Sequence, residues 1–199
     1  MFAVALLFFA QAQYTDLVFV RHGETVANAT GTYNSKTIDT FSDLGKTEVS
    51  DLTGRLVKST RFQAIYVSPS PRVLYTIAPY LRATHQRATI WPLLYECCTG
   101  PRPKYPSITS FSYGAKIKIP SDLAGLFVIA KGEDRYPVSS SYNAGLAQVE
   151  ASLKEFREKC RGQRVLLVGH SGHGGQFLHS IIQRWIRLDN AKEFEFRIQ

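Results

Sequence analysis

The sequence predicts a three-layer α/β domain, in which a sheet of short strands carries helices on both faces. Three observations support this prediction. Short apolar runs alternate with longer amphipathic stretches along the 199 residues. The apolar runs are continuous, which is typical of strands that are buried on both sides. Apolar residues make up 44% of the chain, enough for a packed core.

Four apolar runs are predicted to be strands, at residues 17–20, 62–67, 88–91 and 164–169. The first and the last of them lead directly into polar residues. In open α/β sheets, ligands bind at the carboxyl ends of the strands. The residues that follow each run are therefore the first candidates for a functional site.

Two amphipathic helices are predicted in the first half of the chain. One begins at the capping residue Ser42 and continues through Lys58, with four apolar side chains near one face: Leu44, Val49, Leu52 and Leu56. The other begins at Ser70, which is followed by proline at the first helical position, and carries three side chains inward: Leu74, Ile77 and Leu81. Pro79 is expected to kink this helix or end it early.

Residues 99–138 differ in character from the rest of the chain, because prolines punctuate the stretch and aromatic residues lie between them. This segment is predicted to be a short lid inserted over one edge of the sheet, with one short helix within 121–130. Helical periodicity returns near Ser141, where apolar residues recur at Leu146, Val149, Leu153 and Phe156. A final helix is expected from about Gly174, carrying Phe177, Ile181 and Trp185.

The net charge of +8 comes from 24 Lys and Arg against 16 Asp and Glu. A basic surface can bind nucleic acid or favour small anionic substrates. No block of five or more basic residues occurs, so a nucleic-acid partner is not expected. The three cysteines do not make a disulfide framework, and no CxxC or His-Cys spacing indicates a metal site. We therefore expect no metal or other cofactor.

The first residues have the pattern of a secretory signal peptide. Residues 2–10 are apolar, and a small-x-small sequence follows at 10–12. The run is too short to span a bilayer, so no membrane span is expected. Residues 1–13 are thus predicted to be removed, residues 14–199 to form a single domain, and the protein to be secreted or periplasmic. If residues 1–13 are retained, a cytoplasmic location is expected instead.

The first strand ends in Arg21, His22 and Gly23. Arginine offers a planar fork of donors that fits phosphate oxygens. Histidine can attack phosphorus and carry a covalent intermediate. Glycine lets the backbone approach a ligand closely. These three residues are the first candidate for a phosphate site.

Two further strand ends carry similar chemistry. Arg72 lies in the first turn of the helix that begins at Ser70, where a helix N-terminus already favours anions. The strand at 164–169 leads into His170, and His173 follows three residues later. Because His170 stands where His22 stands relative to its own strand, we assign it the second-histidine role. His173 is the alternative, or contacts the site indirectly.

A carboxylate follows the third strand, at Glu96. A carboxyl group can donate a proton near neutral pH only if burial or negative charge raises its pKa. Glu24 is a rival acid, which we expect to be structural. Asn28 lies six residues past His22 and is a candidate either for phosphate contact or for a turn or cap.

These segments resemble the signatures of the histidine phosphatase superfamily, the phosphoglycerate-mutase-like proteins. Residues 21–23 match its Arg-His-Gly triplet. Residues 68–76 match its Ser-x-x-x-Arg-Ala-x-x-Thr segment, with Val73 in place of alanine. Residues 94–100 match its Leu-x-Glu-x-x-x-Gly segment. The family's second histidine is usually followed directly by glycine, whereas His170 is followed by Ser-Gly.

The resemblance implies a Rossmann-like fold, no metal, and a phosphohistidine intermediate on His22. It also implies that Glu96 protonates the leaving oxygen and that four side chains hold the phosphoryl group: Arg21, Arg72, Asn28 and His170. The short chain and Glu24 favour the compact phosphatase branch over phytase-like relatives. The expected function is a metal-independent, acid-type phosphomonoesterase of small organic phosphates.

Two alternatives remain open at this point: a phosphoglycerate-type phosphomutase, and a catalytically weak pseudo-phosphatase that binds phosphorylated ligands. The oligomeric state is not predicted. Basic residues of the lid are either solvated charges or contacts for a second anionic group of the substrate: Arg102, Lys104, Lys116, Lys118, Lys131 and Arg135.

Overall fold

A computed structural model describes residues 14–199 of the chain, so the predicted signal peptide lies outside the described residues. Six strands form the central sheet: β1 (Thr15–Arg21), β2 (Ala64–Val67), β3 (Ala88–Ile90), β5 (Phe127–Ile129), β7 (Arg164–Gly169) and β8 (Glu193–Ile198). Their order across the sheet is β5-β3-β2-β7-β1-β8. All neighbouring pairs are parallel except β8, which runs antiparallel to β1.

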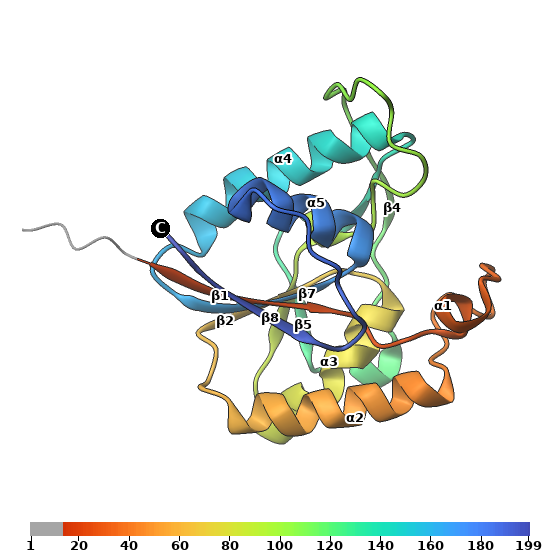
Figure 1. The fold of residues 1–199 in the computed structure, drawn as a ribbon. Helices are drawn as coiled ribbons and strands as arrows, with labels where there is room; N and C mark the ends of the chain where they lie inside the picture. The colour runs from red at the N-terminus through yellow and green to blue at the C-terminus, as the bar shows by residue number, and fades with distance from the viewer. Residues whose placement is uncertain (1–13) are drawn as a thin grey trace, which may run out of the picture.

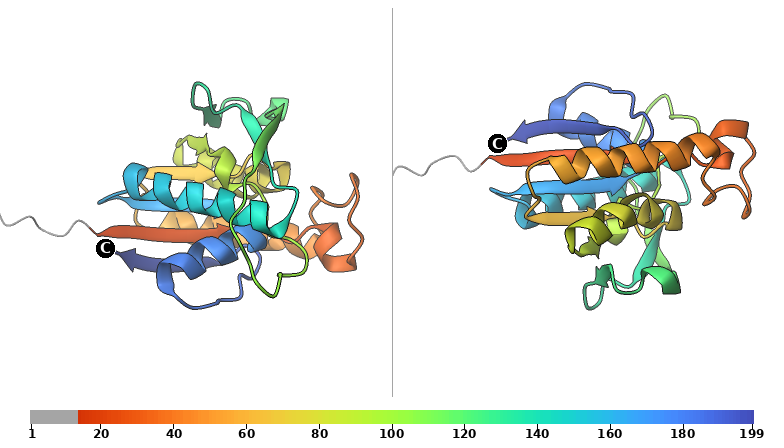
Figure 2. Two further views of the ribbon diagram at one scale, coloured as in Figure 1. Left: turned by 90° about the horizontal axis from the view of Figure 1, so that it is seen from above. Right: turned by 90° about the horizontal axis from the view of Figure 1, so that it is seen from below.

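Four long helices cover the sheet: α2 (Asp43–Lys58), α3 (Pro71–Thr84), α4 (Tyr142–Lys159) and α5 (Ser171–Ile182). Helices α2 and α3 cover one face, and α4 and α5 cover the other (Figure 1). The two views of Figure 2 show these pairs from above and below the sheet. The predicted three-layer α/β fold is therefore confirmed.

Alternate residues of the buried strands face the two helical layers. In β1, Val18 and Val20 belong to the core beneath α2 and α3, while Leu17 and Phe19 belong to the core beneath α4 and α5. The four are at most 1% exposed. Burial on both faces explains why the strands appear in the sequence as continuous apolar runs.

Helix α2 has the predicted bounds, and Ser42 caps it by accepting a hydrogen bond from Gly45 N at 2.9 Å. Leu44, however, is 57% exposed, so its predicted place on the inner face is wrong. It precedes Val49 by five residues, which puts it about 140° around the helix from that side chain.

Pro79 does not end α3 early, because the helix continues to Thr84. Proline removes one backbone hydrogen bond of the helix. The residues around it are buried against the sheet, including Ile77, Tyr80 and Leu81. The apolar contacts of this face outweigh the loss of one bond.

The last helix, α5, begins at Ser171 rather than near Gly174, directly after β7. It ends at Ile182, so Trp185 lies outside it and is half exposed. The Trp185 ring packs against His179 instead, with the ring centroids 3.9 Å apart. The early start matters for function, because it places the helix N-terminus at the end of β7.

Residues 99–138 are only partly an insertion over the sheet edge. Strands β4 (Ser112–Lys116) and β6 (Arg135–Val138) form a separate two-stranded sheet. Strand β5 instead extends the central sheet beside β3. The short helix expected within 121–130 is a 3₁₀ turn, η2 (Ser121–Leu123), before β5. Strand β8 was not predicted, because apolar and charged residues alternate along it and it has no continuous apolar run.

Two short elements complete the fold. Helix α1 (Val26–Thr30) follows the end of β1, and the 3₁₀ turn η1 (Pro92–Leu94) follows β3. Helix α1 and the loop after it project beyond the end of the sheet where β1 terminates (Figure 1). Among residues 14–199, no helix combines the length and apolar character that crossing a bilayer requires.

Two glycines of α2 provide a matched test of its packing. A Cβ on Gly45 would overlap the backbone carbonyl of Glu24, whereas a Cβ on Gly54 would meet nothing within 4 Å. Gly45→Ala is expected to lower the free energy of unfolding by about 1–3 kcal/mol through overpacking. Gly54→Ala is expected to raise it by about 0.5–1 kcal/mol, because alanine favours the helix. Urea unfolding of both variants measures the difference, and equal effects would contradict this packing.

Candidate active site

The site lies where three adjacent parallel strands end. His22 follows β1, His170 follows β7 and Ser68 follows β2. The backbone hydrogen bonding between the strands continues one residue past their ends. His22 N donates to Gly169 O and Ser68 N donates to Val168 O, both at 3.0 Å. The carboxyl ends of parallel strands meet at one edge of the sheet, so residues far apart in sequence become neighbours here.

His22 is 4% exposed, and its protonation is constrained by one contact. Its Nδ1–H donates to the carbonyl oxygen of Gly23 at 2.8 Å, which leaves the Nε2 lone pair free. Burial and, after it, the positive charge of Arg72 lower the pKa of His22 to about 3. His22 is therefore a neutral imidazole near neutral pH.

His170 lies against His22, with the ring centroids 5.4 Å apart and the rings at 65°. The Arg72 guanidinium can only donate, so Nδ1 of His170 accepts from it at 3.3 Å, and Nε2–H donates to Ser68 Oγ at 2.7 Å. Burial, followed by the charge of Arg72, holds the pKa of His170 well below its usual value. The ring is fully buried, and both of its nitrogens are engaged.

Ser70 is the N-cap residue of α3 as predicted, but its hydroxyl makes no capping bond. The Oγ lies 3.2 Å from Nε2 of His170 instead. Pro71 already lacks an N–H at the first helical position, so the helix has fewer donors to satisfy there. The hydroxyl is thus free to help orient the histidine.

Arg72 is held from two sides at the start of α3. Its Nη1 forms an ion pair with Asp39 at 3.0 Å, and its Nη2 donates to His170. The side chain is largely buried. An arginine in the first helical turn opposes the helix dipole, and Asp39 offsets that cost. The guanidinium is therefore fixed in place rather than solvated.

Arg21 approaches the same point from β1. One guanidinium nitrogen, Nη1, donates to Leu188 O at 3.0 Å, while the Nε atom is buried without a partner. Burial lowers the pKa of Arg21, although nearby carboxylates such as Glu96 oppose that shift. Arg21 also lines the cavity, and a guanidinium group in such a position is suited to binding an anion.

Gly23 has a different role from the one expected. A Cβ at this position would meet Val49 Cγ2 at 2.7 Å, so the close approach is to helix α2 rather than to a ligand. The Gly23 N–H donates to Thr76 Oγ1 of α3 at 3.0 Å. Glycine at this position lets α2 pack closely against the backbone next to His22. The hydrogen bond to Thr76 connects the same backbone to α3.

Glu96 reaches the site from the segment after η1. Its Oε1 accepts hydrogen bonds from the backbone N–H groups of His173 at 2.9 Å and Cys97 at 3.2 Å. Burial raises the pKa of Glu96, whereas the His173 N–H and the charge of Arg72 oppose this shift. A raised pKa is the condition under which a carboxyl group can donate a proton.

The structure separates the two candidate histidines. The His173 ring is fully buried, stacks on Phe177, and donates Nε2–H to Ser152 Oγ at 3.0 Å. Its side chain lies in the core of the α4–α5 layer, while its backbone N–H holds Glu96. Only His170 touches the cluster of His22 and Arg72 with its side chain.

A cavity of about 570 Å³ opens over this cluster. Its lining contains the predicted residues Arg21, His22, Asn28, Arg72 and Glu96, and also Thr25, Tyr33, Ile38, Tyr95, Thr99 and Ser171. His170 is not among the lining residues, because its ring lies beneath the floor. The N-terminus of α5 faces the cavity through Ser171.

Asn28 has the cap role that the sequence offered, and its side chain also lies at the cavity. Its Oδ1 accepts from the backbone N–H of Thr25 at 3.1 Å, and Thr25 Oγ1 accepts from Asn28 N at 3.2 Å. These bonds form a capping box at the start of α1. Asn28 also lines the cavity, so the amide hydrogens of Nδ2 are available there.

Glu24 is structural, as expected. Its carboxylate accepts from Ser42 Oγ at 2.6 Å, and its backbone N–H donates to Glu48 at 2.8 Å. These contacts join the end of β1 to the start of α2. Glu24 does not line the cavity.

Several site residues were not identified from the sequence. Ser68 could have been found, because it follows a predicted strand directly, as His22 and His170 do. Asp39 and Tyr33 lie in a loop without periodicity, so nothing in the pattern pairs Asp39 with Arg72. Asn190 donates to His22 O at 2.8 Å from a C-terminal segment that was assigned no role.

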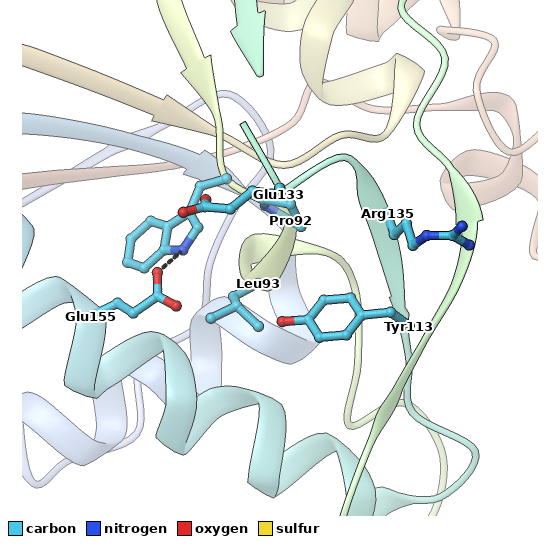
Figure 3. Close-up of a pocket in the computed structure, with 8 residues that line it drawn as sticks. Pro92, Leu93, Tyr113, Glu133, Arg135 and Glu155 are labelled. Atoms are coloured by element: carbon cyan, nitrogen blue, oxygen red, sulfur yellow. Dashed lines mark hydrogen bonds between the residues drawn. The ribbon is translucent and has the colours of Figure 1, made fainter. Parts of the chain in front are cut away.

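A second cavity of about 210 Å³ lies between the β4–β6 sheet and α4 (Figure 3). Trp91 forms part of its wall and donates Nε1–H to Glu155 at 2.9 Å. Glu133 and Glu155 both pair with Lys159, whose ammonium lies 5.4 Å from the Trp91 ring centroid. Lys159 is thus shared between the two carboxylates and balances one of their two negative charges. The three cysteines are free, and Cys97 and Cys160 are buried.

The fold and the cluster at its strand ends define an α/β protein with a cavity whose lining includes a buried histidine and two arginines. A sequence model of the histidine phosphatase superfamily (branch 1) matches residues 17–199, so the chain belongs to that superfamily. The resemblance drawn from the four motifs is therefore confirmed. No curated protein sequence matches the chain.

Solved structures share the fold at low sequence identity. The alpha-ribazole phosphatase from Shigella flexneri is 20% identical, with a TM-score of 0.58, over 92% of this chain and 93% of that chain. The phosphoserine phosphatase from Entamoeba histolytica, solved with 3-phosphoglyceric acid, is 17% identical, with a TM-score of 0.59, over 92% and 90%. A phosphoglycerate mutase from Bacillus anthracis is 14% identical, with a TM-score of 0.56, over 94% and 89%. These similarities establish a common fold.

The buried, neutral state of His173 predicts a pH dependence of stability. Burial lowers its pKa to about 3, whereas the unfolded chain binds a proton near pH 6.5. As pH falls below that value, the unfolded state gains a proton that the native state does not bind, so stability decreases. His173→Phe removes this penalty. Relative to the variant, the wild type is expected to lose about 2 kcal/mol between about pH 7.5 and about pH 5.

Urea unfolding at both pH values measures this effect. Comparison with the variant cancels the contributions of the other titrating groups, including His22, His170 and Glu96. A pH dependence that is the same in both proteins would show that His173 is not a neutral, buried imidazole.

Proposed function

We propose that the protein is a metal-independent phosphomonoesterase of the acid phosphatase type, acting through a phosphohistidine on His22. One observation carries the proposal. His22 donates Nδ1–H to Gly23 O, which leaves an unprotonated Nε2 in a cavity that also contains Arg21 and Arg72. Phosphoryl transfer requires mainly this combination of a positioned nucleophile and cationic donors.

In the first step, His22 Nε2 attacks the phosphorus of the ester, and a nitrogen–phosphorus bond forms as the bond to the leaving oxygen breaks. The guanidinium groups of Arg21 and Arg72 neutralise the phosphoryl oxygens, together with the N-terminus of α5. Glu96 gives its proton to the leaving oxygen, which departs as an alcohol. The hydrogen bond to Gly23 O stabilises the positive charge that develops on the imidazole.

In the second step, water attacks the phosphohistidine. Glu96, now a carboxylate, accepts a proton from the water as the nitrogen–phosphorus bond breaks and phosphate leaves. His22 returns to its neutral form. We assign His170 a positioning role, in place of the catalytic role and phosphate contact expected from the motif, because its buried ring holds Arg72 and is held by Ser68. We assign Asn28 a phosphate contact through Nδ2.

Phosphomutase activity is the alternative reaction. It would require the phosphohistidine to pass its phosphoryl group to a second substrate oxygen faster than water attacks. Measuring phosphate release and phosphoryl relocation on the same ester separates the two reactions. A pseudo-phosphatase is less well supported, because the nucleophile, the two arginines and the acid all lie at one cavity.

Export of the protein, to a secreted or periplasmic location, also belongs to this proposal. The apolar run at residues 2–10 supports it. Removal of residues 1–13 would leave the domain whole, since β1 begins at Thr15. The N-terminal sequence of the protein recovered from its source measures whether this cleavage takes place.

His22→Ala is expected to lower kcat/KM on an alkyl phosphate by at least about a thousandfold, since no other group supplies the attacking nitrogen. Circular dichroism of the variant should match that of the wild type. Labelled substrate quenched in alkali should leave phosphate on wild-type His22 and none on the variant. Activity should persist in a chelator, because the arginines supply the positive charge. Full activity of His22→Ala would overturn the mechanism.

Glu96→Gln is expected to affect poor leaving groups selectively. An alkoxide needs a proton on departure, whereas 4-nitrophenolate does not. The loss of kcat/KM should be about a hundredfold or more for ethyl phosphate and below about tenfold for 4-nitrophenyl phosphate. The ratio kcat/KM reports only the steps up to departure of the leaving group, so the later attack of water does not affect the comparison. Equal losses on both substrates would assign proton donation to another group.

A further inference from the structure

Beyond its phosphate end, the cavity wall carries no charge. Among the lining residues in the described part of the chain, the charged groups are Arg21, Arg72 and Glu96. The first two are needed for the phosphoryl oxygens and the third for the leaving oxygen. The remaining wall consists of hydroxyl, amide, aromatic and aliphatic side chains: Thr25, Asn28, Tyr33, Ile38, Tyr95, Thr99 and Ser171.

The six basic residues of the lid add no charge to this wall, because none of them lines the cavity. Four of them are engaged elsewhere. Arg102 lies 5.5 Å from the Trp185 ring centroid, and Lys104 lies 5.3 Å from that of Tyr105. Lys116 pairs with Asp134, and Arg135 donates to Gly114 O. A second anionic group on the substrate would therefore enter the cavity without a cation to pair with.

Two tyrosines give the uncharged wall its shape. Tyr95 is fixed by edge contacts, with its ring centroid 5.0 Å from Tyr136 and 6.2 Å from His170. Tyr33 stands on the loop between α1 and α2 and is 65% exposed, so its ring has apolar surface left to cover. Ile38 adds an aliphatic contact from the same loop.

The size of the cavity indicates that more than phosphate is bound. At about 570 Å³ it lies within the range of cavities that hold molecules of drug size. Such sites are mostly apolar and aromatic, with a few polar groups that set orientation. Here the polar groups gather at one end and the aromatic groups form the remainder.

We propose that the substrate is a phosphate monoester of an uncharged, ring-bearing alcohol, and that Tyr33 and Tyr95 bind the ring. This inference rests on the proposed function, because it names the substrate class for the same site. Monoesters that carry a carboxylate or a second phosphate are disfavoured, since the wall offers them no cation. Tyr33 is the specificity-determining residue, because it is the exposed aromatic group of the cavity.

A matched series of alkyl esters tests the proposal, because their leaving oxygens are chemically similar. The series contains 2-phenylethyl phosphate, ethyl phosphate and 3-phosphoglycerate. The expected kcat/KM for 2-phenylethyl phosphate exceeds that for ethyl phosphate by about tenfold or more. The value for 3-phosphoglycerate is expected to be the lowest of the three. Equal values for the first two esters, or a preference for 3-phosphoglycerate, would overturn the proposal.

Variants locate the preference. Tyr33→Ala should reduce the ratio of kcat/KM between 2-phenylethyl and ethyl phosphate by about tenfold, and Tyr33→Phe should retain it. Tyr105→Ala is the matched control, because Tyr105 is 79% exposed on the lid and does not line the cavity. An unchanged ratio in Tyr33→Ala, or an equal change in Tyr105→Ala, would show that Tyr33 does not determine the preference for the ring.

A binding measurement keeps this inference separate from the proposed function. Phosphonates cannot be hydrolysed, so calorimetry can compare 2-phenylethylphosphonate with ethylphosphonate without turnover. Tighter binding of the phenyl compound supports the ring site even if no ester is hydrolysed, an outcome that would overturn the phosphatase proposal alone. Equal binding of both phosphonates counts against the ring site whether or not esters are hydrolysed.

Discussion

The parallel pairing of β7 between β1 and β2 is the constraint on which the site depends. It sets His22, His170 and Ser68 side by side, although they come from three distant parts of the chain. A shift of one residue in this register would turn the side chains of the strands to the opposite face. The apolar residues of β1 and β7 prevent such a shift, because alternate side chains are buried in two different cores.

The same burial determines the chemistry. The two histidines are buried beside Arg21 and Arg72, so the imidazoles remain neutral. Each hydrogen bond in the cluster then has a defined donor and a defined acceptor. Arg72 donates to His170, and His170 donates to Ser68. A buried cluster of positive charge is costly without an anion, and Asp39 offsets only part of that cost. The bound phosphoryl group would provide the remainder.

Prediction from the sequence succeeded where a single element carries the signal. Ser42 and Lys58 delimit α2 because capping and apolar spacing are local properties. It was wrong where packing decided the outcome. Helix α3 continues past Pro79 because its inner face is buried. Residues 127–129 join the central sheet because β3 offers an unpaired edge. Strand β8 was missed, since an edge strand exposed on one side lacks a continuous apolar run.

The sequence by itself determined the α/β class, the superfamily, and the positions of His22, Arg72 and Glu96 at their strand and helix ends, because local pattern and motif carry that information. Only the tertiary structure decided that His170, and not His173, contacts the cluster. Both follow β7 closely, but the direction of each side chain depends on the start of α5 and on what packs against it. The uncharged wall around Tyr33 was likewise decided by tertiary structure, because a cavity is formed by residues that share no pattern in the sequence.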